Sequence, residues 1–403
     1  MSPVPMSGNR PYILDVSRLI WRLNGARLPT GIDRVCLAYL TAFADRSLAL
    51  VQWKSLRLVL PAAESDQLFA LLQAEHGAGF KARLCAIVLR ALMRRLAGKP
   101  PISGKILLNV GHTGLNAPGL TEWTQRSGVR PVYLIHDLIP ITHPQFCREG
   151  EDARHRMRMR QALHSAHGII ANSQATLDDL AQFADGEGLP MPESLVAHLG
   201  VEPLEAHPND GIHPKPYFLA TGTIEARKNH ALLLRLWPRL RDIMGAGTPD
   251  LVFIGQRGWL ADDVFAELGR EQPRHGRVIE LGRCDDAALA SWIAGSRAVL
   301  MPSHAEGYGL PVIEALALGA PVIANSLAVY REIAGSAPLL IDVADEDAWL
   351  KALVEYSGNS PQRQQRVAEA AGLRPLGWHD HIEKVEFWLS HRLGQWPVEG
   401  TPV

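Results

Sequence analysis

The stretch SHAEGYGLPVIEALALGA, residues Ser303–Ala320, decides how this chain folds. It follows an apolar run, Ala298–Met301, of the kind that forms a buried β-strand. Gly307 and Gly309 would let the backbone of the connecting loop come close to a ligand, and Pro311 suits the first turn of a helix. The pattern therefore predicts a strand, a glycine-rich loop and a helix in succession, as in α/β proteins.

Two glutamates flank this loop. Glu306 is expected in the loop itself and Glu314 in the first turn of the helix. Exposed N–H groups around Leu310–Val312 would point at a ligand, and the N-terminus of a helix favours phosphate. Two carboxylates beside such a site can each bind a pair of neighbouring hydroxyls, which a sugar and a ribose both offer. The alternative is an ordinary strand–turn–helix unit with surface glutamates.

Short apolar runs alternate with helical patterns along the whole chain. The expected strands are Tyr12–Val16, Lys105–Val110, Val132–Ile135, Gly168–Ala171, Tyr217–Ala220, Leu251–Ile254, Arg277–Leu281, Ala298–Met301, Pro321–Ala324 and Leu339–Ile341. Helical patterns include Arg34–Ala44, Gln67–Ala74 and Ala175–Phe183. This alternation predicts parallel sheets with helices on both faces.

One segment separates the two halves of this pattern. Glu202–Pro216 contains four prolines and little hydrophobic pattern, so it is the best candidate for a linker. We therefore expect an α/β protein with two Rossmann-like domains, residues 1–205 and 206–375. Ligands bind such sheets at the carboxyl ends of the strands, so the active site would lie in a cleft between the domains.

The composition is that of a folded protein in a reducing compartment. Of 403 residues, 47% are hydrophobic and 21% charged, which excludes a disordered or fibrous chain. The 4 cysteines are far apart, which disfavours a disulfide framework or a structural zinc site. The first ten residues lack the apolar core of a secretory signal, and no apolar stretch is long enough to span a membrane. These features predict a cytoplasmic protein.

The net charge of −1 hides an asymmetry between the halves of the chain. Residues 1–160 contain 22 Lys and Arg against 11 Asp and Glu, whereas residues 161–403 contain 19 against 31. A basic half can face nucleic acid, an anionic membrane or a phosphorylated substrate. The plainer alternative is that two domains simply differ in surface charge.

A basic amphipathic segment, Ala82–Leu96, lies in the basic half. Its apolar residues have helical spacing, and the basic residues at or near one side are Arg83, Arg90, Arg94, Arg95 and Lys99. Such a helix can lie on an anionic bilayer. It can equally pack against its own domain, and the segment alone does not decide between the two.

A basic pair follows the first expected strand of the second domain. In Thr221–His230, TGTIEARKNH, Arg227 and Lys228 stand just before a helix, with Asn229 as its expected N-cap. A guanidinium fork and an ammonium at a helix start suit a diphosphate, and Gly222 lies just upstream.

Two residues at strand ends in the first half are further candidates. His136 ends the expected strand Val132–Ile135, so it should point into the cleft. Asp15 lies near the end of the first strand, where it could approach an acceptor hydroxyl or merely cap a turn.

Several segments together resemble a known family. EGYGLPVIE, Glu306–Glu314, resembles the E-x7-E signature of retaining glycosyltransferases of family 4, which have the GT-B fold. Four more segments are similar to motifs of that family: the G-x-x-G-W turn in Phe253–Trp259, the N-domain histidine motif in Ile135–Pro140, the A-x-S-x-x-T turn in Ala171–Thr176, and the G-I-x-R loop of its mannosyltransferase-like branch in Thr30–Arg34. The resemblance covers about residues 11–395.

The resemblance implies a GT-B fold with a first acceptor domain, a second donor domain and a C-terminal segment, residues 376–403, packing back on the first domain. It implies His136, Glu306, Arg227 and Lys228 as catalytic residues. The donor would contact Gly31, Gly222, Arg227, Lys228, Gly307, Tyr308, Gly309, Leu310, Pro311 and Glu314. Glu306 would hold the transferred sugar and Glu314 the ribose, and no metal or other cofactor would be needed.

The implied activity is transfer of a sugar, expected to be mannose from GDP-mannose, to a glycan or polyprenyl-linked glycan in surface polysaccharide synthesis. A sugar-transfer site disfavours nucleic acid as a partner, and the basic first domain then favours peripheral attachment to the cytoplasmic membrane. The alternatives are a nucleotide-sugar 2-epimerase, a phosphorylase with bound pyridoxal phosphate, or a non-catalytic binding protein of the same fold.

Overall fold

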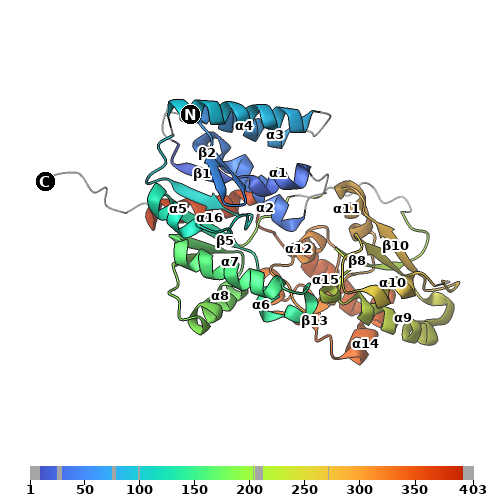
Figure 1. The fold of residues 1–403 in the computed structure, drawn as a ribbon. Coiled ribbons are helices and arrows are strands. Elements are labelled where there is room, and N and C mark those ends of the chain that lie inside the picture. The colour runs from blue at the N-terminus through green and yellow to red at the C-terminus, as the bar shows by residue number, and fades with distance from the viewer. Residues whose placement is uncertain are drawn as a thin grey trace.

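Two β-sheets, each covered by helices on both faces, organise the chain (Figure 1). The structure is a computed structural model, and it describes residues 10–24, 30–74, 79–98, 100–202, 204, 212–270 and 272–393. The boundary expected at residues 205 and 206 lies outside the described residues. The α/β class and the two Rossmann-like domains are confirmed.

The first sheet has seven strands in the order β3-β2-β1-β4-β5-β6-β7. All neighbours are parallel except β3, which is antiparallel to β2. The strands are β1 (Tyr12–Asp15), β2 (Ser47–Trp53), β3 (Leu56–Val59), β4 (Ile106–Asn109), β5 (Arg130–Ile135), β6 (Gly168–Ala171) and β7 (Glu193–Val196). The helices are α1 (Ser17–Asn24), α2 (Gly31–Phe43), α3 (Ala62–Gln73), α4 (Phe80–Ala97), α5 (Leu120–Ser127), α6 (Ile139–Thr142), α7 (Glu151–Ser165) and α8 (Gln174–Gly186).

The second sheet has six parallel strands in the order β10-β9-β8-β11-β12-β13. The strands are β8 (Tyr217–Thr221), β9 (Asp250–Ile254), β10 (Val278–Gly282), β11 (Val299–Met301), β12 (Val322–Asn325) and β13 (Leu339–Ile341). The helices that follow β8 in the chain are α9 (His230–Met244), α10 (Asp262–Leu268), α11 (Asp286–Ala294), α12 (Leu310–Ala317), α13 (Ala328–Ala334), α14 (Glu346–Ser357), α15 (Pro361–Gly372) and α16 (Trp378–His391).

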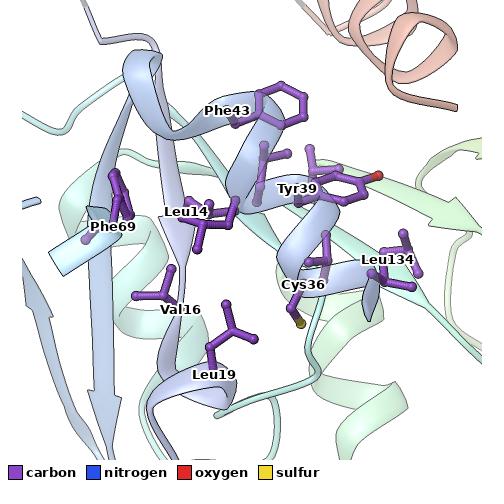
Figure 2. Packing of buried hydrophobic residues seen from close by; sticks show 14 of the residues in the cluster. Leu14, Val16, Leu19, Cys36, Tyr39, Phe43, Phe69 and Leu134 are labelled. Atoms are coloured by element: carbon purple, nitrogen blue, oxygen red, sulfur yellow. The ribbon is translucent and has the colours of Figure 1, made fainter. Parts of the chain in front are cut away.

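Alternating side chains explain why both faces of the sheets are covered. In β1, Leu14 packs with the helices α1 to α4, whereas Ile13 points to the opposite face. Figure 2 shows Leu14 and Val16 on the helix side, packed with Tyr39 and Phe43 of α2 and other apolar side chains. Strands that are apolar on both faces are typical of a parallel sheet buried between two helix layers.

All ten expected strands are present, with ends that differ by up to two residues. Three further strands were missed. β7 is an edge strand whose residues are only partly buried, so it has no apolar run. β2 and β3 form a hairpin whose two-residue turn contains Lys54 at φ 53°, and neither Lys54 nor Ser55 is a strong turn signal.

The last helix returns to the first domain. Val385, Trp388 and Leu389 of α16 belong to the same hydrophobic cluster as β1 and α2. The crossing point is tight, because a Cβ on Gly200 would lie 2.3 Å from the backbone nitrogen of Trp378. The chain therefore runs from the first domain into the second and back, and its C-terminal helix packs on the first domain.

No helix in the described part of the chain is both long and apolar enough to cross a membrane.

Candidate active site

The glycine-rich loop after β11 makes the central contact between the domains. A Cβ on Gly307 would lie 2.4 Å from the carbonyl oxygen of His136, so only glycine fits against the end of β5. Gly309 has φ +106° and stands directly before α12, where a Cβ would lie 2.6 Å from the ring of Tyr330. The expected strand, loop and helix are thus in place, and the loop lies at the carboxyl ends of both sheets.

Two hydroxyls of the first domain hold the loop in this position. Ser173 Oγ and Thr176 Oγ1 both donate to the carbonyl oxygen of Gly307, at 3.4 Å and 3.2 Å. Ser173 also caps α8 by accepting from the N–H of Thr176. The A-x-S-x-x-T turn therefore contributes to the domain contact.

Glu306 and the basic pair form one buried ion cluster. Lys228 Nζ lies 2.6 Å from Glu306 Oε1, and Arg227 Nη1 lies 2.9 Å from Oε2. Burial raises the pKa of Glu306, but the attraction of Arg227 and Lys228 is stronger and lowers that pKa to about 2. Glu306 is therefore a carboxylate at neutral pH.

Arg227 has further partners within the second domain. It donates to Glu225 Oε1 at 2.6 Å and to the carbonyl oxygen of Ala305 at 2.8 Å. Burial lowers the pKa of Arg227, but Glu306 and Glu225 together raise it above its ordinary value. The position of the guanidinium is thus fixed, as a preorganised anion site requires.

The helix after the basic pair starts differently from the expectation. Asn229 stands before α9, but its side chain does not cap the helix. It adopts φ 54° and donates Nδ2 to the carbonyl oxygen of Pro302 instead. Gly222, with φ +112°, lies beside this turn, and a Cβ there would lie 3.7 Å from Lys228 Nζ.

Glu314 lies one residue deeper in α12 than expected and so just past its first turn, because the helix already begins at Leu310. Its Oε1 accepts from Arg34 Nη1 of α2 at 2.5 Å, and Arg34 also reaches Asp286 at 3.3 Å. Burial raises the pKa of Glu314, and Arg34 opposes this. The second glutamate is therefore paired with a cation of the first domain.

The expected N–H donors at the start of α12 are fewer than the sequence suggested. The N–H of Val312 donates to the carbonyl oxygen of Gly309 at 2.9 Å, and Pro311 has no N–H. Only the N–H of Leu310 remains among these three residues. The side chain of Leu310 lies beside Gly31, where an added Cβ would be 3.5 Å from Leu310 Cδ1.

His136 is buried at the end of β5 in its neutral form. Its Nε2 lies 2.7 Å from the carbonyl oxygen of Val110, so Nε2 carries the proton and Nδ1 is the acceptor. Burial is the main reason that the pKa of His136 falls to about 4. At neutral pH the ring can accept a hydrogen bond from a hydroxyl, and it has no proton to give from Nδ1.

Two histidines beside His136 were not predicted. The ring of His112 lies 5.0 Å from that of His136 and 6.2 Å from that of His155. Burial lowers the pKa of both neighbours. His112 follows the end of β4, so the rule that ligands bind at strand ends could have identified it.

Tyr308 and Asp15 both make structural hydrogen bonds, and for Asp15 the turn cap is one of the two roles expected from the sequence. The ring of Tyr308 packs in the first-domain core, and its hydroxyl donates to the carbonyl oxygen of Leu199 at 3.1 Å. The expected contact of Tyr308 with the donor stays a prediction. Asp15 accepts from Ser17 N at 2.9 Å and from Gln52 Nε2 at 2.6 Å, so it caps the turn after β1.

A second cross-domain contact lies beside the loop. Phe146, from the segment after α6, stacks on His304 with ring centroids 4.6 Å apart. Its carbonyl oxygen accepts from Trp259 Nε1 at 3.3 Å, and Arg148 lies over the same indole ring. The G-x-x-G-W turn thus ends on the first domain.

No group of three or more His, Cys, Asp or Glu side chains that could hold a metal ion occurs among the described residues. Metal independence stays a prediction.

The chain is similar in sequence to known glycosyltransferases. The family model of glycosyl transferases group 1 matches residues 215–359. The chain is 28% identical over 298 residues to the serotype-specific mannosyltransferase WbdA of Escherichia coli, covering 69% of this chain and 34% of WbdA. It is 34% identical over 157 residues to the O-antigen chain mannosyltransferase B of Escherichia coli, covering 39% of this chain and 40% of that protein. The chain thus spans about a third of the length of WbdA.

Solved structures share the fold at low sequence identity. Anabaena HepE in complex with UDP and glucose has a TM-score of 0.66 and 16% identity, covering 95% of this chain and all of that one. The trehalose 6-phosphate synthase of Burkholderia multivorans has a TM-score of 0.63 and 12% identity, covering 96% and 99%. Residues 215–359 therefore carry a glycosyl transferases group 1 domain, in a chain with the two-domain fold of these enzymes.

Proposed function

We propose that this protein is a retaining glycosyltransferase that transfers a sugar from a nucleoside diphosphate donor to an acceptor hydroxyl. One observation carries the proposal: the buried cluster of Glu306, Arg227 and Lys228, placed where the loop of the second domain touches His136. Two fixed cations beside a carboxylate suit a diphosphate attached to a sugar. The match of residues 215–359 to glycosyl transferases group 1 supports the same activity.

In the proposed reaction the bond between the anomeric carbon and the diphosphate oxygen breaks, and a bond to the acceptor oxygen forms on the same face. The proton of the acceptor hydroxyl passes to the departing diphosphate. Arg227 and Lys228 stabilise the charge on that diphosphate, while Glu306 binds sugar hydroxyls and Glu314 the ribose. Neutral His136 accepts a hydrogen bond from the sugar at Nδ1.

The proposed donor is GDP-mannose and the proposed acceptor a growing surface glycan, free or linked to a polyprenyl lipid. Both relatives named above are mannosyltransferases, and one acts on O-antigen chains according to its name. A thermal-shift screen against GDP- and UDP-sugars identifies the donor, because saturation at about 100 times Kd adds about 2.7 kcal/mol.

The test of the activity is nucleotide release from the identified donor with and without manno-oligosaccharides. Replacing both Arg227 and Lys228 with Ala should abolish release and weaken nucleotide binding, since charge-assisted bonds to phosphate are strong. Arg239→Ala is the matched control, because Arg239 pairs with Asp347 on the outer surface. Full activity in the double variant would refute the site. Conversion of the donor sugar without an acceptor would instead identify an epimerase.

We also propose that α4 attaches the enzyme to anionic membranes. One face of α4 packs on the core through Phe80, Leu84, Ile87, Val88 and Ala91. The opposite face is apolar and exposed, with Leu89 at 59%, Leu92 at 42%, Met93 at 55% and Leu96 at 91%. The spacing of these four residues places them in one stripe.

Basic residues flank this exposed stripe on both sides. By helical spacing, Arg83, Arg90 and Arg94 follow one edge, and Lys81 and Arg95 follow the other. The basic residues were expected at or near one side of the helix, and they instead lie along two edges. An apolar stripe between two basic edges is typical of helices that lie in a membrane interface. Lys99 of the expected basic set lies outside the described residues.

Vesicle flotation tests the attachment. Binding to phosphatidylcholine vesicles should require added phosphatidylglycerol and decrease with salt. Replacing Leu89, Met93 and Leu96 with Ser should release the protein without changing donor affinity. Arg94 is unsuitable for charge reversal, because it lies 3.1 Å from buried Glu64. A wild-type protein that stays unbound at low salt would refute the attachment.

A further inference from the structure

Two exposed tryptophans lie side by side on the first domain. Trp21 of α1 is 51% exposed and Trp53, the last residue of β2, is 62% exposed. Their ring centroids are 5.7 Å apart, with the ring planes inclined by 45°. Large aromatic side chains contribute most when buried, so two that remain in solvent together indicate a binding surface.

The pair lies at the edge of the first sheet where ligands bind. β1 and β2 are parallel neighbours; Trp53 lies at the carboxyl end of β2, and Trp21 lies in the helix that follows β1. Gln52, next to Trp53, donates its backbone N–H to Ser17 Oγ at 2.7 Å and its side chain to Asp15 at 2.6 Å. These bonds tie the end of β2 to the start of α1, so the backbone that carries both rings is fixed.

The same helix is linked to residues that contact the second domain. Arg18 and Arg22, on either side of Trp21 in α1, both bind Asp33, at 2.6 Å and 2.8 Å. Asp33 is the neighbour of Arg34, which reaches Glu314 and Asp286 of the second domain. Figure 1 shows α1 on the side of the first domain that is nearest to α11. The aromatic pair therefore belongs to the first-domain rim of the proposed active site.

We propose that Trp21 and Trp53 form a stacking platform for a sugar ring of the acceptor glycan, one or more units away from the reacting hydroxyl. One face of a pyranose presents C–H groups, which pack on an aromatic face and are attracted by its negative quadrupole. The rim of hydroxyls stays in water, which suits rings that are half exposed. This proposal rests on the proposed glycosyltransferase function and assigns residues that bind its acceptor.

Binding of trisaccharides to the full-length protein tests the platform. The probes are mannotriose, maltotriose and the methyl α-glycosides of mannose and glucose, followed by tryptophan fluorescence and by saturation-transfer NMR. At least one trisaccharide should bind, and Trp21→Ala and Trp53→Ala should each weaken it about tenfold. The Phe variants should retain part of the affinity. Phe387→Ala is the matched control, since Phe387 is 64% exposed on α16.

Kinetics separate the platform from the proposed function. In both Ala variants the KM for a trisaccharide acceptor should rise while kcat and the affinity for nucleoside diphosphate stay unchanged. Failure of diphosphate binding in the wild type would contradict the proposed function instead. The platform is wrong if no trisaccharide binds, or if binding is undiminished in the double variant. Loss of vesicle flotation in these variants with sugar binding intact would assign the pair to the membrane and overturn the platform.

Discussion

Glu306 is the residue whose replacement should most clearly separate stability from donor binding. It is the shared counter-charge of Arg227 and Lys228, and its side chain is only 9% exposed. Glu306→Gln keeps the shape of the side chain and removes the charge, which leaves two largely buried cations, with Glu225 as the remaining carboxylate partner of Arg227. Removing one partner of a buried ion pair costs about 3–5 kcal/mol.

We therefore expect the ligand-free Glu306→Gln protein to lose about 3 kcal/mol, which lowers Tm by roughly 6–12 °C for a domain of this size. Added nucleoside diphosphate supplies the missing negative charge, so it should raise the Tm of the variant more than that of the wild type. The diphosphate should also bind at least as tightly by calorimetry, because Glu306 no longer competes for the two cations. Turnover should still fall, since the transferred sugar loses its carboxylate.

The control for this experiment is Glu225→Gln, which weakens only the contact of Arg227. A Glu306→Gln protein that is as stable as the wild type would show that the ion cluster is not buried as described. Weaker diphosphate binding in Glu306→Gln would refute the competition between Glu306 and phosphate.

Two further predictions concern the other carboxylates. Burial raises the pKa of Asp15 to about 6, so the folded protein holds that proton more tightly than the unfolded chain, and stability should fall by about 3 kcal/mol as pH rises from about 3 to about 7. Asp15→Asn should remove this pH dependence in urea unfolding without lowering kcat, whereas a large loss of kcat would favour the acceptor role over the turn cap. Glu314→Gln should weaken the binding of the free nucleoside diphosphate and of the nucleotide-sugar alike, raising each Kd about tenfold in calorimetry. Unequal losses would show that Glu314 does not hold the ribose.

The local pattern of the sequence was enough to predict ten of the thirteen described strands, the glycine-rich loop and the position of the basic pair. Each of these depends on neighbouring residues: apolar runs, glycines at tight approaches and Pro311 at a helix start. The first residue of α12 was harder to predict. Leu310 continues the apolar pattern, and the helix begins there, one residue before the proline. That shift alone moves Glu314 out of the first turn.

The contacts between the domains were not accessible from the sequence. Arg34 and Glu314 are 280 positions apart, and Thr176 and Gly307 are 131 apart. Such pairs depend on how two independently folded sheets are placed against each other, which no local pattern encodes. Tyr308 shows the same point, since its ring enters the core of the other domain, a contact that its neighbours in the sequence do not indicate.

The spacing of the two glutamates now has a structural reason. The turn at Gly307–Gly309 separates them so that Glu306 faces the cations of its own domain and Glu314 faces Arg34 of the other. Each carboxylate already has a cationic partner, so a donor that takes both must replace two ion pairs of different kinds. At Glu306 the exchange stays within the second domain, because Arg227 and Lys228 can release the carboxylate and bind the diphosphate instead. Exchange at Glu314 removes a link between the domains, so engagement of the ribose would couple donor binding to the relative position of the two domains.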